Sequence, residues 1–299
     1  MNLVSLSLSP IFIIGSPRSG TTLLRLMLTC HREISIPPES GYILWLKDKY
    51  RYWSDKSNNK ENVDSFLSDL FRAKKFDTYK MNRSVLEAEI YKYKPSNYAE
   101  LIAVINICFA NQLDKKISAW GDKNNYYLNH IDEIRDLFPS AKFIHIVRDG
   151  RDVACSYREV MDSYSGKRFA PDLPIAIGDI ANSWQDDVIK IHNQLQKKEF
   201  SSFCIRYEDL VDDPAGQLTS LCEYIGFEFD SNMINFWKDN RDSLLEPKET
   251  MYWKKKTINP IDNTSVGRYR LMLTDDEINE FNFIAGNALN LFGYKINQS

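Results

Sequence analysis

Residues 11–22 read IFIIGSPRSGTT, and this stretch decides the fold of the chain. Four apolar residues end at Gly15, and Gly20 is followed by a helical pattern of apolar residues. A buried strand, a tight loop and a helix start, in that order, turn backbone N–H groups toward an anion. Because Gly15 and Gly20 have the spacing of a phosphate-binding loop, we predict that a phosphate-like group binds here.

The positive charge of this loop comes from an arginine, whereas in ATP-binding loops it comes from a lysine. In those loops the lysine follows the second glycine and contacts the β- and γ-phosphates. Thr21 stands at that position here, and Arg18 supplies the positive charge. A guanidinium donates from a planar fork, which suits an oxyanion with several equivalent oxygens. We therefore expect a single phosphate-like group, the alternative being a glycine-rich turn with an exposed arginine.

The composition favours a globular protein without general affinity for nucleic acid. The 299 residues are 43% hydrophobic, which is enough for a sizeable core, and the net charge of −3 argues against nucleic-acid binding. No apolar run reaches the ~18 residues of a membrane span. Residues 1–14 lack the Lys or Arg of a signal peptide. An odd number of cysteines without a CxxC pair predicts buried thiols in a reducing compartment, so we expect a cytoplasmic location.

Predicted strands alternate with predicted helices along the whole chain. The strands are expected at 11–14, 34–36, 117–120, 141–147 and 203–206. The helices are expected at 21–29, 41–50, 63–71, 84–91, 97–113, 129–138, 149–160, 175–198, 214–226 and 274–292. This alternation predicts an α/β fold of three layers, like that of P-loop-containing NTPases, with a central and mostly parallel sheet. We predict one domain over residues 1–299, with helical insertions at about 39–113 and 238–265.

A second segment, residues 143–157, reads FIHIVRDGRDVACSY. Its strand delivers Arg148 to the C-terminal end, which is the edge where parallel α/β sheets bind ligands. Ser156 follows two turns into the next helix, so the two side chains could hold a second phosphate. The alternative is that Arg148 and Arg151 pair with neighbouring aspartates in a surface cluster.

The two segments together resemble the sulfotransferases that use 3′-phosphoadenosine 5′-phosphosulfate (PAPS). The P-R-S-G-T-T loop and the R-D-x-R-D-x-x-x-S segment are most similar to the branch of tyrosylprotein sulfotransferases and many bacterial enzymes. The resemblance implies that Arg148 and Ser156 hold the 3′-phosphate and that no metal is required. It also implies that the first loop holds the 5′-phosphosulfate, through Arg18, Ser19, Gly20, Thr21 and Thr22. The absence of a lysine after Gly20 is consistent with this donor, because PAPS has no β/γ-phosphate pair for a lysine to contact.

Three further segments extend the resemblance. Residues 121–124, GDKN, are similar to a "DK[TS]P" segment, which implies that Lys123 reaches the transferred sulfuryl group and the bridging oxygen. Residues 206–210, RYEDL, are similar to a segment near the adenine, which places Tyr207 beside the nucleotide. Residues 266–270 resemble a "GRW" loop that closes over the nucleotide, which adds Gly267 and Arg268 to the binding residues.

The resemblance also points to a catalytic base. Counted from the first loop without a gap, Glu39 falls on the glutamate that serves as base in the tyrosylprotein branch. The alternative is that Glu39 is only a first-turn acid of the helix predicted at 41–50, favoured there by the helix dipole. Histidine is the rival base, used by cytosolic small-molecule sulfotransferases. We expect His145 to be a hydrogen-bonded core residue and the others to face solvent: His31, His130 and His192.

The sequence thus predicts in-line transfer of a sulfuryl group from PAPS to a hydroxyl acceptor. Glu39 would take the proton, while Arg18 and Lys123 stabilise the developing charge. A kinase, which Thr21 disfavours, and a non-catalytic nucleotide-binding protein are the alternatives. The lack of a signal or membrane segment favours a small molecule, a carbohydrate or a lipid over a protein as acceptor.

Two basic stretches can each be interpreted in two ways. Residues 45–60 interleave lysines and aromatics, which is typical of a carbohydrate or acidic-ligand site but also of a solvated helix face with inward aromatics. Residues 254–256, three lysines, could support the nucleotide loop or lie on the surface.

Overall fold

Five parallel strands form the centre of the protein. The computed structural model describes residues 9–238, 246–247, 254, 257 and 259–296. Within these residues one sheet has the order β2-β3-β1-β4-β5. The strands are β1 (Ile11–Ile14), β2 (Ile34–Ser35), β3 (Ala119–Lys123), β4 (Lys142–Val147) and β5 (Ser201–Arg206). All four strand pairs in the described part of the chain are parallel, so the predicted parallel sheet is confirmed.

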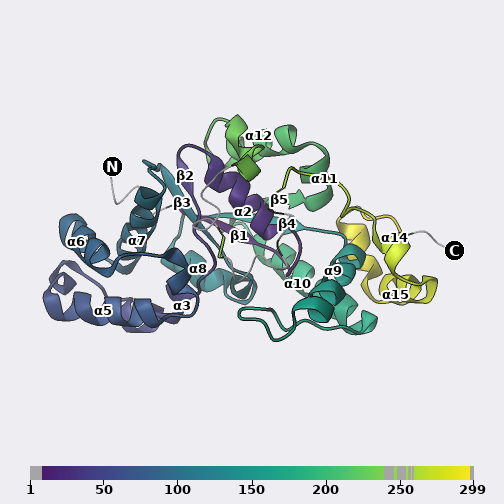
Figure 1. The fold of residues 1–299 in the computed structure, drawn as a ribbon, viewed down its shortest axis with the longest axis horizontal. Coiled ribbons are helices and arrows are strands. Elements are labelled where there is room, and N and C mark those ends of the chain that lie inside the picture. The colour runs from purple at the N-terminus through teal and green to yellow at the C-terminus, as the bar shows by residue number, and fades with distance from the viewer. Residues whose placement is uncertain (1–8, 239–245, 248–253, 255–256, 258, 297–299) are drawn as a thin grey trace.

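Helices cover the sheet on both sides and extend beyond it at both ends. Figure 1 shows α11 and α12 above the sheet, α9 and α10 below it, the helical segment α5–α7 at one end and α14–α15 at the other. The predicted three-layer α/β fold is therefore confirmed. The α-helices are α2 (Thr21–Cys30), α3 (Tyr42–Trp45), α4 (Lys47–Tyr50), α5 (Lys60–Arg72), α6 (Arg83–Tyr93), α7 (Tyr98–Gln112), α8 (Ile131–Leu137), α9 (Gly150–Tyr164), α10 (Ile177–Leu195), α11 (Tyr207–Asp212), α12 (Pro214–Ile225), α14 (Tyr269–Met272) and α15 (Asp275–Leu291). Short 3-10 turns are η1 (Asp55–Ser57), η2 (Phe76–Tyr79), η3 (Asn125–Asn129), η4 (Ser231–Met233) and η5 (Phe236–Lys238).

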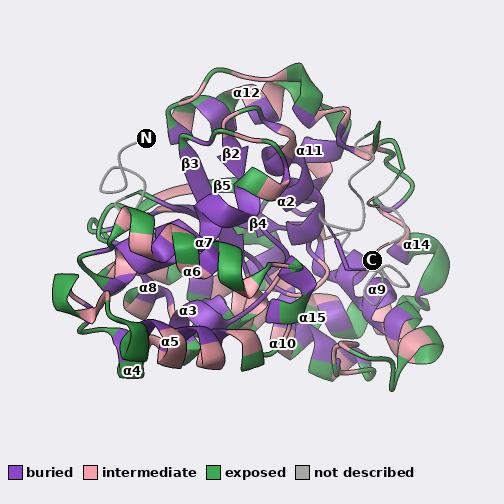
Figure 2. Ribbon diagram, turned by 60° about the vertical axis from the view of Figure 1, so that its left-hand side comes forward, coloured by how far each residue is buried: buried purple, intermediate pink, exposed green. Residues whose placement is uncertain are grey.

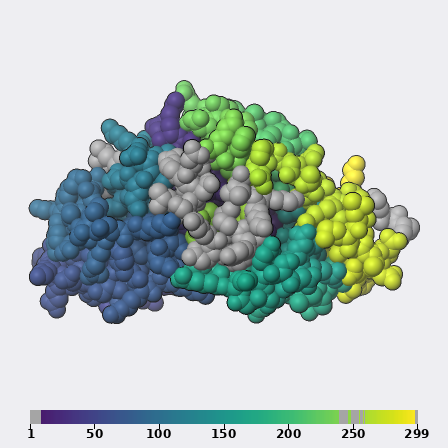
Figure 3. Space-filling model, in the orientation of Figure 1, coloured from purple at the N-terminus to yellow at the C-terminus, as the bar shows by residue number. Residues whose placement is uncertain are grey.

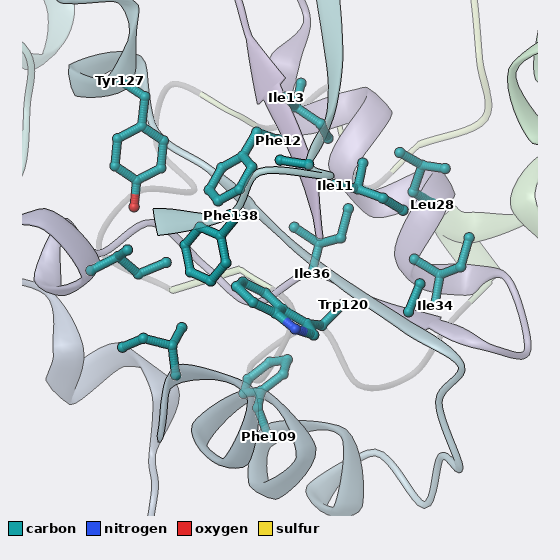
Figure 4. Packing of buried hydrophobic residues seen from close by; sticks show 14 of the residues in the cluster. Ile11, Phe12, Ile13, Leu28, Ile34, Ile36, Phe109, Trp120, Tyr127 and Phe138 are labelled. Carbon is teal, nitrogen blue, oxygen red and sulfur yellow. The ribbon is translucent and has the colours of Figure 1, made fainter. Parts of the chain in front are cut away.

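The strand β1 is central because every side chain in it is apolar and buried. A strand buried on both faces reads as a continuous apolar run. Figure 2 shows buried colour at the centre of the molecule and exposed colour mainly on the outer helices and loops. On one side of β1, Phe12 packs against four aromatic rings, and Figure 4 shows three of these neighbours. The four rings belong to Trp120, Tyr127, Phe138 and Phe143.

The strand predicted at 117–120 is wrong in its position. The observed β3 runs on to Lys123 and includes Gly121 and Asp122, which the sequence assigned to a loop. These residues pair with β1 on one side, with Gly121 opposite Ile11. A Cβ at Gly121 would lie 2.4 Å from the carbonyl oxygen of Ile11, so a glycine is needed for this close approach. These residues thus form a strand because they pair with β1, although their local sequence is typical of a loop.

Several helix predictions also need correction. The helix predicted at 41–50 is two short helices, α3 and α4, that meet at Leu46. The helix α5 begins at Lys60, earlier than predicted, because the Asn59 side chain accepts a hydrogen bond from the backbone of Asn62. No prediction covered α11, which follows β5 without a turn between them. The other predicted strands and helices are present, with ends that differ by a few residues. The irregular segment predicted at 238–265 lies partly outside the described residues.

Two predictions about histidines are wrong. His31 is fully buried, not solvent-facing, and its Nε2 lies 3.0 Å from the carbonyl oxygen of Glu228. His145 is buried as expected, but its Nε2 has no hydrogen-bond partner within the described part of the chain. Of the cysteines, which are all free thiols, Cys204 is exposed although burial was expected.

The ends of the strands position the site. In a parallel sheet all C-terminal ends lie at one edge. The loop after β1, the end of β3, the start of α9 and the start of α11 therefore meet there. Within the described ranges, no helix is both long and apolar enough to cross a membrane.

Truncating Phe12 tests the role of the central strand. Phe12 is fully buried, so Phe12→Ala should lower the free energy of unfolding by about 3–5 kcal/mol. Urea unfolding followed by tryptophan fluorescence measures this loss. The control is Phe283→Ala, because Phe283 is 91% exposed and its loss should cost less than about 0.5 kcal/mol. Equal changes in the two variants would contradict the assignment of β1 as the core strand.

Candidate active site

A cavity of about 910 Å³ opens at the C-terminal edge of the sheet. Its lining combines residues from the loop after β1 with residues that follow β3, β4 and β5. Of the residues predicted for the site, the cavity is lined by Arg18, Gly20, Thr21, Thr22, Glu39, Lys123, Arg148, Ser156, Tyr207 and Arg268. Ser19 and Gly267 are not among the lining residues. The structure therefore brings residues from 18 to 268 around one space.

The loop after β1 presents the open N-terminus of α2 to this cavity. Gly20 has a left-handed φ of 95°, and a Cβ there would lie 2.5 Å from the Tyr207 ring, so only glycine fits. Ser19 holds the loop from inside, because its hydroxyl lies 2.6 Å from that of Ser16. No side chain caps α2, and no acid lies in its first turn. Its N–H groups and dipole are thus available to an anion.

Three arginines gather around Ser156 at one end of the cavity. Arg18 Nε donates to Ser156 Oγ at 3.0 Å, and Arg148 Nη1 donates to the carbonyl oxygen of Arg18 at 3.3 Å. Burial, together with the charges of Arg148 and Arg268, lowers the pKa of Arg18 to about 10. The sequence assigned Arg18 and Ser156 to opposite ends of a nucleotide, whereas here they touch. Glu159, on the same helix as Ser156, forms an ion pair of 2.6 Å with Arg268. The concentration of guanidinium groups suits a phosphate.

The alternative of a surface cluster at Arg148 and Arg151 is only half correct. Arg151 does pair with Asp149, at 2.7 Å, but both side chains are buried. Arg148 instead faces the cavity, with its guanidinium 4.6 Å from the centre of the Tyr207 ring. Asp152 accepts hydrogen bonds from the backbone N–H groups of Gly267 and Tyr269, which fixes the 266–270 segment next to α9.

Glu39 lies between two lysines. Lys123 Nζ donates to Glu39 Oε1, and Lys75 Nζ donates to Oε2 at 2.8 Å. Burial alone would raise the pKa of Glu39, but Lys123, Lys254 and Lys75 hold it well below its ordinary value. Burial also lowers the pKa of Lys123 to about 8, although Glu39 opposes that shift. The first turn of α3 contains no acid, so the alternative role of Glu39 as a helix-capping residue is wrong.

A second buried acid lies close by, and sequence reasoning missed it. Glu246 accepts from Arg25 Nη2 at 2.6 Å and also pairs with Lys254. Burial would raise the pKa of Glu246, but Lys254 and Arg25 hold it at about 2. Lys254 lines the cavity, whereas the other two lysines of the 254–256 run lie outside the described residues. The sequence did contain a signal for this acid. Arg25 is a charged residue within an apolar helical pattern, and a buried charge needs a partner of opposite charge. No such signal marks Lys75.

The remaining candidates contribute less to the cavity. No histidine is among its described lining residues. Within the described ranges, no group of three or more His, Cys, Asp or Glu side chains could hold a metal ion. In the basic aromatic stretch, Tyr50 and Trp53 turn inward as a solvated helix face predicts, but Trp45 and Tyr52 are exposed.

Comparisons with known proteins point to one family. A family model described as "Sulfotransferase family" matches residues 10–231. The curated "Protein-tyrosine sulfotransferase 1" of Danio rerio is 24% identical over 226 residues, which are 75% of this chain and 55% of that protein. The Homo sapiens protein of the same name is 31% identical over 142 residues, 47% of this chain and 31% of that protein. The chain thus spans about half, or less, of the length of these relatives.

Solved structures show the same fold. The "Sulfotransferase Domain from the Curacin Biosynthetic Pathway" aligns with a TM-score of 0.51 and 20% identity, and the alignment covers 89% of this chain and 97% of that one. The sulfotransferase STF9 from Mycobacterium avium aligns with a TM-score of 0.50 and 15% identity, covering 98% of this chain and 79% of that one.

A buried carboxyl group next to Lys123 makes the stability depend on pH. Burial raises the pKa of Asp122 to about 7, above the ~3.9 of an unfolded aspartate. Its contribution to the free energy of unfolding is therefore fully present below about pH 4 and is lost as the pH rises through about 7. We predict that Asp122→Asn reduces this loss by about 1–3 kcal/mol. Urea unfolding at pH 5 and pH 8.5 measures it.

The control for this experiment is Asp114→Asn, because Asp114 is an exposed carboxyl with a left-handed backbone that asparagine also accepts. It should retain the wild-type pH dependence. If Asp122→Asn also retained it, the titration of Asp122 would not explain the loss.

Proposed function

The chain belongs to the sulfotransferase family, and we propose that it transfers the sulfuryl group of PAPS to a hydroxyl group of an acceptor. One observation carries this proposal: the uncapped start of α2 and a cluster of arginines line a single cavity that also contains the Glu39–Lys123 pair. PAPS has anionic groups at its 5′ and 3′ positions, and each matches one of these sites. A nucleoside triphosphate would need only one.

The residues present fit the donor. The uncapped N-terminus of α2, with Thr21 and Thr22, would bind the 5′-phosphosulfate, and Ser19 would support this loop through its contact with Ser16. The cluster around Ser156 would bind the 3′-phosphate, through Arg18, Arg148 and Arg268 together with the Ser156 hydroxyl. Tyr207 lines the same cavity and would lie beside the adenine, and the segment with Gly267 and Arg268 would close over the nucleotide.

The Glu39–Lys123 pair supplies the two charges that the reaction needs. Glu39 accepts the proton of the acceptor hydroxyl, whose oxygen forms a bond to sulfur. The bond between sulfur and the 5′-phosphate oxygen breaks, and its electron pair leaves with adenosine 3′,5′-bisphosphate. Lys123 would donate a hydrogen bond to the leaving oxygen and the sulfuryl group, while Arg18, whose Nε is bound to Ser156, would stay with the 3′-phosphate. The low pKa of Glu39 keeps it ionised at neutral pH, so it is ready to accept a proton.

The acceptor would enter from the side of the cavity formed by Lys74, Lys75 and residues 169–173. This part of the lining mixes charged, aromatic and aliphatic side chains. We propose a hydroxyl of a small molecule, carbohydrate or lipid, with a protein tyrosine as the competing class because of the names of the curated relatives.

Substitution of Glu39 tests the proposed reaction. We expect the wild-type protein to bind adenosine 3′,5′-bisphosphate in calorimetry and to transfer label from [³⁵S]PAPS to at least one acceptor in a panel of phenols, sugars, sterols and tyrosine peptides. Glu39→Gln should lower the rate by about 100-fold or more and leave nucleotide affinity within about twofold, because a general base acts only on the acceptor. The control, Glu61→Gln on the exposed start of α5, should match the wild type. If neither nucleotide binding nor transfer is found, the proposal fails.

The alkaline pH dependence tests Lys123. Burial lowers the pKa of Lys123 to about 8, so the protonated form is lost above that pH. We predict that kcat/KM falls about tenfold per pH unit above pH 8. In Lys123→Arg the fall should move beyond pH 10, because a guanidinium stays protonated there. A profile of kcat/KM from pH 6 to 10 shows the outcome, and a wild-type profile that stays flat to pH 10 would exclude this role.

A further inference from the structure

Lys75 is a second partner of Glu39 that lies outside every recognised motif. It comes from the helical segment between β2 and β3, at the N-terminal cap of η2. Its backbone has a left-handed φ of 67°, a conformation that residues with a side chain rarely adopt outside sites that require it. Its ammonium group donates a hydrogen bond to Glu39 Oε2, and the ammonium group of Lys123 donates one to Oε1. Both oxygens of Glu39 are thus occupied by lysines in this structure.

The reaction proposed above, on which this inference rests, conflicts with that arrangement. A base needs a free oxygen for the incoming proton, and Lys123 is needed at the leaving oxygen. Lys123 lies at the end of β3 and is almost fully buried, whereas Lys75 lies farther from the sheet and is 23% exposed. Lys123 is therefore the lysine that turns to the donor. A buried carboxylate without a contacting counter-ion is strongly destabilised, and Lys75 is the second cation in direct contact with Glu39.

We propose that Lys75 is a positioning residue, which keeps the Glu39 carboxylate ionised and aimed into the cavity when Lys123 moves from Glu39 to the donor. Donor binding then exchanges one partner of Glu39, freeing Oε1 for the acceptor hydroxyl while Oε2 stays fixed. Lys75 acts through Glu39 and does not itself touch the reacting atoms.

Contacts that do not involve the donor hold Lys75 in place. Its ammonium group lies 5.7 Å from the centre of the Phe169 ring, in the loop after α9. The same two segments are joined by the Arg168–Asp77 ion pair of 2.6 Å, and Figure 3 shows them side by side. The residue before Lys75 accepts a hydrogen bond from Ser40, next to Glu39, at 3.1 Å. The segments that carry Lys75 and Glu39 are thus connected by this hydrogen bond as well as by the ion pair between the two side chains.

The charged and titratable groups around Glu39 come from several elements. Lys123 and Asp122 face it from β3, Lys75 from the start of η2 and Tyr79 from its end, and Lys254 from the segment before α14. Three of these are cations, so removal of one still leaves the carboxylate ionised at neutral pH. What changes is the pH at which it gains a proton, which Lys75 and the others hold low.

Kinetics of Lys75 variants test the proposal. The assay uses [³⁵S]PAPS with 4-nitrophenol, and with water as the acceptor that is always present, from pH 4.5 to 9. Lys75→Met should lower kcat about tenfold or more and move the acid limb of kcat toward neutral pH by about one unit, because the carboxylate loses a counter-charge worth a pKa shift of that order. Lys75→Arg should restore both. The affinity for adenosine 3′,5′-bisphosphate should stay within about twofold in both variants.

Lys80→Met is the matched control. Lys80 lies at the other end of η2, also with a left-handed φ, 51°, and is exposed. It should keep the wild-type kcat and acid limb. Phe169→Leu is a second probe, which removes the ring beneath Lys75 but leaves both lysine contacts to Glu39, and it should show the same changes at a smaller size.

The outcomes separate this inference from the proposed function. If the wild type binds no nucleotide and transfers no label, the proposed function fails and Lys75 has no reaction to assist. If Glu39→Gln remains active, the base assignment fails, and the inference with it. If transfer requires Glu39 but Lys75→Met has the wild-type kcat and acid limb, the inference alone is overturned. Should Lys75→Met not fold, an unchanged acid limb in Phe169→Leu would overturn it equally.

Discussion

The hydrogen bonding of β1 to a parallel strand on each side is the constraint on which the site depends. The register places Ile13 opposite both Lys123 of β3 and Ile144 of β4. The loop that leaves β1 therefore emerges between the end of β3 and the end of β4. Because these strands are buried and paired on both sides, Lys123, the loop and Arg148 cannot move apart without breaking the sheet. The distance between Lys123 and the arginine cluster is thus set by backbone pairing.

Concentrating so many cations in one cavity is costly, and the structure offsets part of the cost with three carboxylates. Glu39, Glu246 and Glu159 each pair with at least one of the basic side chains. Burial and the neighbouring arginines nevertheless lower the pKa of Arg18 to about 10, which marks a local excess of positive charge. A ligand with several negative charges would remove this imbalance, and binding to the folded protein alone would stabilise it.

What the sequence could predict follows from how local each signal is. The apolar run of β1, the glycine spacing and the arginine after β4 are encoded within a few residues, and the parallel sheet then brings them together. Lys75, Glu246 and the burial of His31 depend on packing between segments far apart in the chain, and no short pattern marks them. The end of β3 was misjudged for a related reason. Gly121 and Asp122 read as a loop, and only their pairing with β1 makes them a strand.

The side chains of the site therefore come from two parts of the molecule that are held in place in different ways. The groups that would hold the donor come from the sheet edge and its adjoining helices, where pairing and register fix them. The partners of Glu39 on the acceptor side, Lys75 and the Phe169 loop, come from segments outside the sheet and are held by side-chain contacts and one surface ion pair. The exposed ion pair contributes little to stability, whereas Phe76 and Tyr79, which follow Lys75, are buried in the main core and connect this segment to the rest of the fold. In the proposed reaction, the donor side of the site would therefore depend on the sheet, and the acceptor side would depend on segments outside it.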